Sequence, residues 1–187
     1  MSIVNELDLE TLELKAGGHA PGSGEMCVME AVAFVAGESW SDHPACASKV
    51  IGAFMRSWND SLDDTGRQLL KPYVTRLVGT AGDDALEARR AWMATDWLVR
   101  VQTPAWLRLA GLTEQAERLA ALPELVGGDQ VPSIKPALEA ARSDAAAAWA
   151  AAWDAARDAA RAALAPTVEE LQISAHQLLD NMIEVSV

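Results

Sequence analysis

Cysteine and tyrosine are scarce in this chain of 187 residues, and basic residues are outnumbered by acidic ones. The two cysteines, Cys27 and Cys46, are too few to form a disulfide framework for a chain of this length. The 15 Lys and Arg residues against 27 Asp and Glu residues give a formal net charge of −12. Non-specific binding of nucleic acid needs clustered cations. Direct nucleic-acid binding is therefore not expected.

The chain also lacks a long hydrophobic segment. Its longest apolar tract, residues 145–153, is too short to cross a bilayer, which takes about 20 residues. Residues 1–14 alternate acidic and aliphatic side chains, and they have neither the basic start nor the apolar middle of a secretory signal. We therefore expect a cytoplasmic protein that does not enter a membrane.

Helix signals dominate the sequence, and no strand-rich part is recognisable. Ser23 is suited to cap one helix, and Ser41 or Asp42 to begin the next. A further helix from Asp83 is predicted to end at Pro104, because proline interrupts helical hydrogen bonding. The predicted fold class is all-α, a compact multi-helix bundle with one long Ala-rich helix.

The length fits a single helical domain, residues 1–187, with a buried core. Within it we distinguish three parts by composition. Residues 1–24 form an N-terminal arm and a Gly-rich loop, residues 25–131 the main helical part, and residues 132–187 the Ala-rich helix and a C-terminal helix.

Alanine dominates from Pro136 to Leu164, and alanine is the best helix former. We expect one long helix there, ended by Pro166, before a last helix begins. Its small side chains would let a second helix approach closely, so self-association through this helix is an expectation. Trp149 and Trp153 lie one turn apart, as packing residues or, less simply, as a stacking platform for a ligand.

Four residues with metal-binding side chains lie within a short stretch: His19, Cys27, His43 and Cys46. Both cysteines fall in the first turn of a predicted helix, where exposed amides and the helix dipole favour the thiolate. Two thiolates and two imidazoles would complete a tetrahedral structural zinc site. Zinc is the one cofactor that this pattern suggests, although the spacing is weaker than that of paired CxxC motifs.

The same stretch also suggests thiol catalysis. Cys27 would be the nucleophile, His43 or His19 the base, and Glu30 or Asp42 the carboxylate that orients the imidazole. The simpler interpretation is that both cysteines are small buried hydrophobic residues without a reactive role. Because familiar catalytic motifs such as HExxH and GxSxG are missing from the sequence, an enzyme is the less favoured prediction.

Cationic and indole side chains interleave farther along the chain. This arrangement suits an anionic aromatic ligand such as a nucleotide, held by cation–π and stacking contacts. An amphipathic helix pair with indoles inward and arginines outward is the simpler interpretation. The residues concerned are Arg89, Arg90, Trp92, Trp97, Arg100 and Trp106.

Three stretches resemble a family of bacterial and phage-borne proteins known only as hypothetical proteins. They are GGHAPGSGEMCVMEAVAFVAGE, SWSDHPACASKVIGAFMRSWND and ATDWLVRVQTPAWLRLAGL, and an Ala/Arg/Asp/Trp-rich tract and PTVEELQ follow them. The resemblance covers most of the chain. It implies a cytoplasmic accessory protein associated with mobile elements, and it assigns no catalytic residue.

The function predicted first is a small acidic helical binding protein that sequesters a host protein or a small anionic ligand. A thiol- or zinc-dependent enzyme centred on Cys27 is the second hypothesis, with His19 or His43 as its imidazole. A structural or virion component is the third. The identity of the partner is left open.

Overall fold

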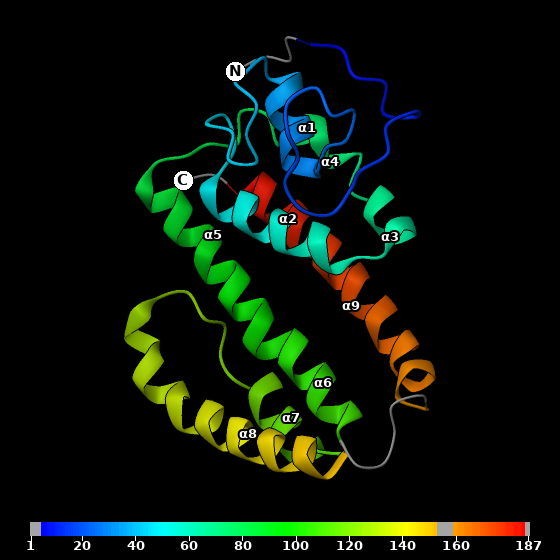
Figure 1. The fold of residues 1–187 in the computed structure, drawn as a ribbon. Coiled ribbons are helices and arrows are strands. Elements are labelled where there is room, and N and C mark those ends of the chain that lie inside the picture. Colours follow the sequence, from blue (N-terminus) through cyan, green and yellow to red (C-terminus); the bar gives the residue numbers. More distant parts are fainter. Residues whose placement is uncertain (1–4, 153–158, 186–187) are drawn as a thin grey trace. The chain divides into compact units, whose positions relative to one another are not determined.

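The computed structural model describes residues 5–152 and 159–185, and the regular elements among these residues are helices, with no strand (Figure 1). The predicted all-α fold class is confirmed. Within the same residues, no helix combines the length and the hydrophobicity that a bilayer crossing requires.

The chain divides into two compact units, which we describe separately. Unit 1 comprises Met1–Arg90 with Met182–Val187, and unit 2 comprises Ala91–Asn181. Unit 1 contains α1 (Val28–Val35), α2 (Lys49–Ser61), α3 (Asp64–Gln68), α4 (Tyr73–Arg76), the first half of α5 (Asp84–Trp97) and the end of α9 (Ala159–Glu184). Unit 2 contains the rest of α5 and α9, a π-helix (Leu98–Gln102), α6 (Thr103–Leu109), α7 (Thr113–Ala120), a short 3₁₀-helix (Gly128–Gln130) and α8 (Val131–Ala152).

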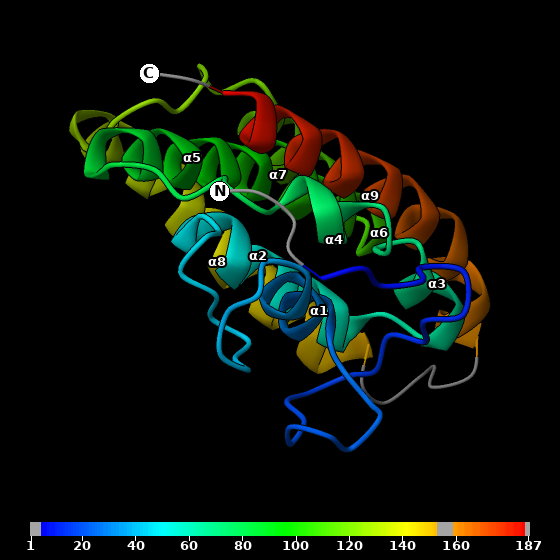
Figure 2. The ribbon, with the colours of Figure 1, turned by 90° about the horizontal axis from the view of Figure 1, so that it is seen from above.

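Helix α1 is the centre of the core of unit 1. Its sequence, VMEAVAFV, is apolar on almost every side, as expected for a helix with neighbours all round. Val28, Ala31 and Val32 have no exposed surface. The helix packs against α2 and α4, and Figures 1 and 2 both show it beside α2.

The first two helices begin later than the sequence predicts. Cys27, not Ser23, is the N-cap of α1, and Ser48 caps α2, so the predicted start at Ser41 or Asp42 is wrong. The Glu38 carboxylate explains the second difference. It accepts hydrogen bonds from the N–H groups of Ala45 (2.6 Å) and Cys46 (2.7 Å), which hold this segment in turns outside a helix.

Pro104 does not end the helix that begins at α5. The chain continues through the π-helix into α6, and Pro104 lies in the first turn of α6. The N–H of Thr103 bonds to the carbonyl of Leu98, five residues earlier. A π-turn widens the helix just before the proline, where a regular α-helix would place a carbonyl against the ring.

The Ala-rich tract is shared between α8 and α9. Residues 153–158, and with them Trp153, lie outside the described residues, and the side chain of Trp149 is not described either. The expectations of one long helix and of an indole platform therefore stay predictions. Pro166 lies inside α9, so the predicted break at this residue is wrong.

The core of unit 2 joins α6, α7 and α8. Leu107, Ala116, Leu119 and Ala141 form one buried cluster. A second cluster contains Val99, Leu125 and Ile134, with Trp92 packed against it. The partly buried Trp92 indole thus packs against an aliphatic core.

A partly buried ion pair connects the start of α2 with α5 in unit 1. The Glu87 carboxylate accepts hydrogen bonds from the Ser48 hydroxyl (2.8 Å), the Val50 N–H (2.9 Å) and the Arg90 guanidinium (3.0 Å). Burial alone would raise the pKa of Glu87, but these donors outweigh it and hold the pKa below its ordinary value. Glu87 therefore keeps its charge at neutral pH.

Arg90 completes this network. It is 2 % exposed, and it donates to the carbonyls of Thr80 (2.6 Å) and Met182 (2.8 Å). The residue predicted as part of a ligand site thus holds backbone segments together.

Replacing Arg90 with Met is expected to destabilise the protein by about 3 kcal/mol, because it removes the hydrogen bonds of a buried guanidinium to two carbonyls and to the partly buried Glu87 carboxylate. Urea unfolding at pH 7 measures this change. The matched control is Arg118→Met, since Arg118 pairs with Glu114 on the surface and exposed pairs contribute little. An equal decrease in the free energy of unfolding in both variants would contradict the structural importance of Arg90.

Candidate functional site

The Glu30 side chain fixes the Gly-rich loop that precedes α1. Its Oε1 accepts the His19 N–H (2.6 Å), and its Oε2 accepts the Cys27 N–H (2.7 Å) and lies 2.9 Å from His19 Nδ1. The carbonyl of His19 in turn accepts a hydrogen bond from the Trp40 indole (2.7 Å). The carboxylate therefore joins two ends of the loop and places His19 between α1 and Trp40.

Glu30 is 2 % exposed and remains ionised. Burial alone would raise its pKa, but the hydrogen bonds from the His19 and Cys27 N–H groups and from the imidazole hold the pKa below its ordinary value. This pattern is that of a structural carboxylate, because a general base needs a proton affinity near the working pH.

Cys27 is a buried cap rather than an exposed thiolate. Its sulfur accepts the Glu30 N–H at 3.5 Å, and the residue is 3 % exposed. Burial raises the pKa of Cys27 to about 12. The expectation that its place at the helix start favours the thiolate is therefore wrong, because desolvation outweighs the helix amides.

Cys46 is also buried, and burial followed by the nearby Glu38 raises its pKa. His43 is largely exposed and pairs with Asp42, whose Oδ1 lies 2.6 Å from the imidazole Nδ1. In residues 5–152 and 159–185, no group of three or more His, Cys, Asp or Glu side chains is placed to hold a metal ion. The four predicted zinc ligands do not form one site there.

Of the predicted catalytic residues, Cys27 and Glu30 lie together in the cap of α1, whereas His43 pairs with Asp42. Glu30 orients His19, whereas Asp42 orients His43. Both carboxylate–imidazole pairs named as alternatives in the sequence exist, but the thiol beside Glu30 is protonated at neutral pH. This arrangement does not supply an activated thiol nucleophile.

The interleaved arginines and tryptophans have several partners within the protein. Arg89 and Arg90 belong to unit 1, and Trp92, Trp97, Arg100 and Trp106 to unit 2. In unit 2, Arg100 binds the Asp96 carboxylate through Nε (2.6 Å) and Nη2 (2.8 Å) and donates to the Leu122 carbonyl. The indole of Trp97 donates to the Ser174 hydroxyl, and Trp106 is 39 % exposed. Arg100 and Trp97 thus make contacts typical of a stable core, and a ligand site at these residues stays a prediction.

A cavity that the sequence did not reveal lies in unit 1 beside the start of α2. Its volume is about 570 Å³, within the range of small-molecule sites. Much of its wall is apolar and built from small side chains. The apolar lining comprises Met29, Pro44, Ala45, Ala47 and Ala81.

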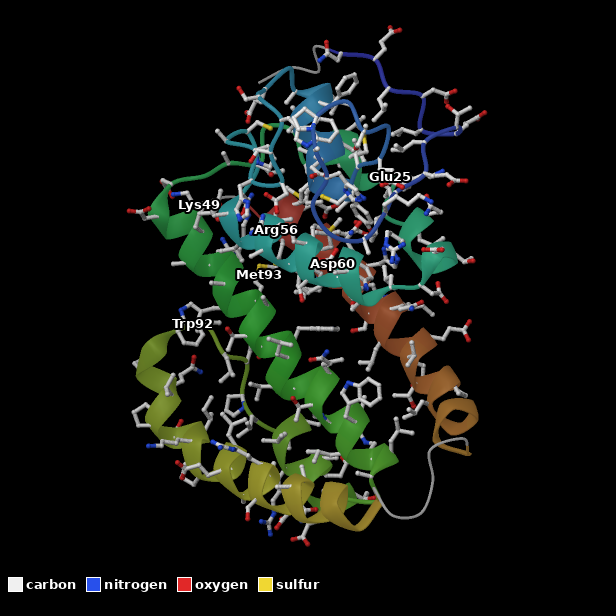
Figure 3. The ribbon with its side chains drawn as sticks, viewed as in Figure 1. Glu25, Lys49, Arg56, Asp60, Trp92 and Met93 are labelled. Atoms are coloured by element: carbon white, nitrogen blue, oxygen red, sulfur yellow. The ribbon has the colours of Figure 1, made fainter. Side chains whose placement is uncertain are left out.

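Two cations of α2 line this cavity. Lys49 and Arg56 are seven residues apart, so they lie on one face of the helix, as Figure 3 shows. Gly52 lies between them: a Cβ at this position would be 3.4 Å from Arg56 Nη1 and 3.3 Å from Met29 Cε. The guanidinium therefore folds back over the glycine toward the start of α2, where it also donates to the Asp42 carbonyl (2.9 Å).

The remaining polar groups of the cavity are His43, Ser48, Asp84 and Glu87. The Ser48 hydroxyl donates to Glu87 and accepts the Ile51 N–H, so its hydrogen bonds serve the fold. The cavity thus combines cationic hydrogen-bond donors with an apolar wall. The helical spacing of Lys49, Gly52 and Arg56 was the available sequence signal, but the rest of the lining comes from distant segments.

Replacing Glu30 with Gln is expected to destabilise the protein by about 1–3 kcal/mol at pH 7, because a buried acceptor of N–H groups is lost. Folding lowers the pKa of Glu30, so the ionised carboxylate stabilises the folded protein fully at pH values above the ordinary pKa of 4.5. This stabilisation is lost as the pH falls through the pKa that Glu30 has in the folded protein. Urea unfolding from pH 7 to pH 3 should therefore show the two proteins converging. Glu10→Gln, on the exposed N-terminal arm, is the control, and a pH-independent difference would argue against this role.

Both thiols are expected to react slowly with a disulfide reagent such as dithionitrobenzoate at pH 8, and rapidly once guanidinium unfolds the chain. The reason is that burial raises the pKa of Cys27 and of Cys46. Cys46→Ser isolates Cys27 in this assay. Fast labelling of that folded variant would contradict a protonated, buried Cys27.

No protein-family model, no curated protein and no solved structure matches this chain.

Proposed function

We propose that this protein is a small helical binding protein that holds a small organic anion in the cavity at the start of α2. The observation that carries the proposal is the pair Lys49 and Arg56 on one helix face beside an apolar wall. Such a wall and a few charged donors are the usual composition of a small-molecule site. Arginine and lysine both bind carboxylates and phosphates, arginine with a planar set of donors.

Two observations favour binding over catalysis. Burial raises the pKa of Cys27 to about 12, which removes the thiolate that the enzyme hypothesis requires. Ser48, the hydroxyl residue of the cavity, has its hydroxyl engaged by Glu87 and by the backbone of α2. His43, oriented by Asp42, is then a further donor or acceptor for a ligand.

A site that binds without turnover removes its ligand from solution. We therefore propose sequestration of this anion in the cytoplasm as the biological role. The resemblance to phage-borne proteins supports an accessory role of this kind.

The test measures the binding of hexanoate, adipate and ADP to the full chain by saturation-transfer NMR. At least one of these anions should bind. The double variant Lys49→Ala/Arg56→Ala should weaken that binding at least tenfold, about 1.4 kcal/mol, because both cations line the cavity.

The control is Lys135→Ala/Arg118→Ala, which removes the same charges from exposed positions of unit 2. This control separates contacts in the cavity from the effect of net charge. No binding of any anion, or equal weakening in both double variants, would refute the proposed function.

A further inference from the structure

The charged groups of the cavity are distributed over two helices. Lys49 and Arg56 belong to α2, whereas Asp84 and Glu87 belong to the first turns of α5. A ligand in this cavity therefore lies near cations from one helix and near carboxylates from the other. The balance between the two sets determines how much negative charge the site accepts.

The cationic surplus is small. Glu87 is compensated by Arg90, which leaves Lys49 and Arg56 opposed by Asp84, a surplus of one positive charge. Asp42 reduces it further, since its Oδ2 is 4.0 Å from Arg56 Nε. The lysine, the two arginines and the carboxylates together therefore leave at most one positive charge for a ligand. A second negative charge would face Asp84 without compensation.

The net charge of the whole protein also disfavours ligands with more than one negative charge. Its net charge of −12 repels anions, and the repulsion grows with the charge of the ligand. At physiological salt this repulsion is screened beyond about 8 Å, so the residues that line the cavity dominate selectivity.

The wall of the cavity favours an aliphatic ligand body. Met29 and Ala47 are buried apolar residues that line it, and Pro44 adds a further apolar side chain. The described lining residues include no Phe, Tyr or Trp, so a nucleobase would have only the His43 imidazole and the Arg56 guanidinium as stacking partners, whereas an aliphatic body can lie on the whole apolar wall.

We infer that the ligand is a singly charged organic anion with an aliphatic body, a monocarboxylate in chemical terms, and that Asp84 rejects dianions and polyphosphates. This inference rests on the proposed function and specifies the ligand of the same cavity. The carboxylate binds to the donors of Lys49 and Arg56, and the aliphatic part lies on the wall around Met29. Asp84 is a specificity-determining residue because its charge opposes a second anionic group.

Hexanoate and adipate provide a matched comparison, because both have six carbons and differ by one carboxylate. NMR titration of the ¹⁵N-labelled full chain should give a Kd for hexanoate at least tenfold lower than for adipate or ADP. Asp84→Asn should reduce the ratio of the adipate Kd to the hexanoate Kd at least threefold. Glu10→Gln, which changes the net charge equally at an exposed position outside the cavity, should leave this ratio of Kd values unchanged.

The outcomes separate this inference from the proposed function. Binding of adipate or ADP at least as tight as that of hexanoate, still weakened by Lys49→Ala/Arg56→Ala, would overturn the inference and support the proposed function. A preference for hexanoate that Asp84→Asn does not reduce would overturn the role of Asp84. If none of the three anions binds in a way that depends on Lys49 and Arg56, both proposals are refuted.

Discussion

The carboxylate of Glu87 is the constraint on which unit 1 depends. It accepts hydrogen bonds from Ser48 and Val50 at the start of α2, and it holds Arg90, which reaches the carbonyls of Thr80 and Met182. This one ion pair therefore joins the start of α2, the segment before α5, α5 itself and the end of α9. Since the cavity lies against the same turn of α2, the position of its cations depends on this ion pair.

Other acidic side chains also accept hydrogen bonds from backbone N–H groups, so part of the acidic composition stabilises the fold. Segments between helices have backbone N–H groups without a helical partner, and a buried N–H without an acceptor is costly. Carboxylates supply the acceptors for several of them. The pairs are Glu30 with His19 and Cys27, Glu38 with Ala45 and Cys46, Asp60 with Gly17, and Asp96 with Leu125.

These contacts explain what could be predicted from the sequence and what could not. Helix periodicity is local, so the all-α fold class follows from it. The start of α2 depends on Glu38, whose hydrogen bonds to Ala45 and Cys46 replace the expected cap at Ser41 or Asp42. The reactivity of Cys27 was misjudged because the helix start is visible in the sequence, whereas burial is set by segments that fold over it. The cavity needs residues from α1, α2 and α5, and no single stretch shows this combination.

Gly52 links the stability of α2 to the proposed ligand site. Its backbone conformation is helical, and glycine in a helix interior costs about 1 kcal/mol relative to alanine, so the fold alone would favour alanine. The Cβ of an alanine would lie 3.3 Å from Met29 Cε and 3.4 Å from Arg56 Nη1, which are tight contacts with ends of flexible side chains. Such ends can move, but Met29 and Arg56 both line the cavity, so their movement would change its lining. A glycine at this position therefore leaves the cavity lining undisturbed at a cost in helix stability, a compromise that agrees with the proposed ligand site.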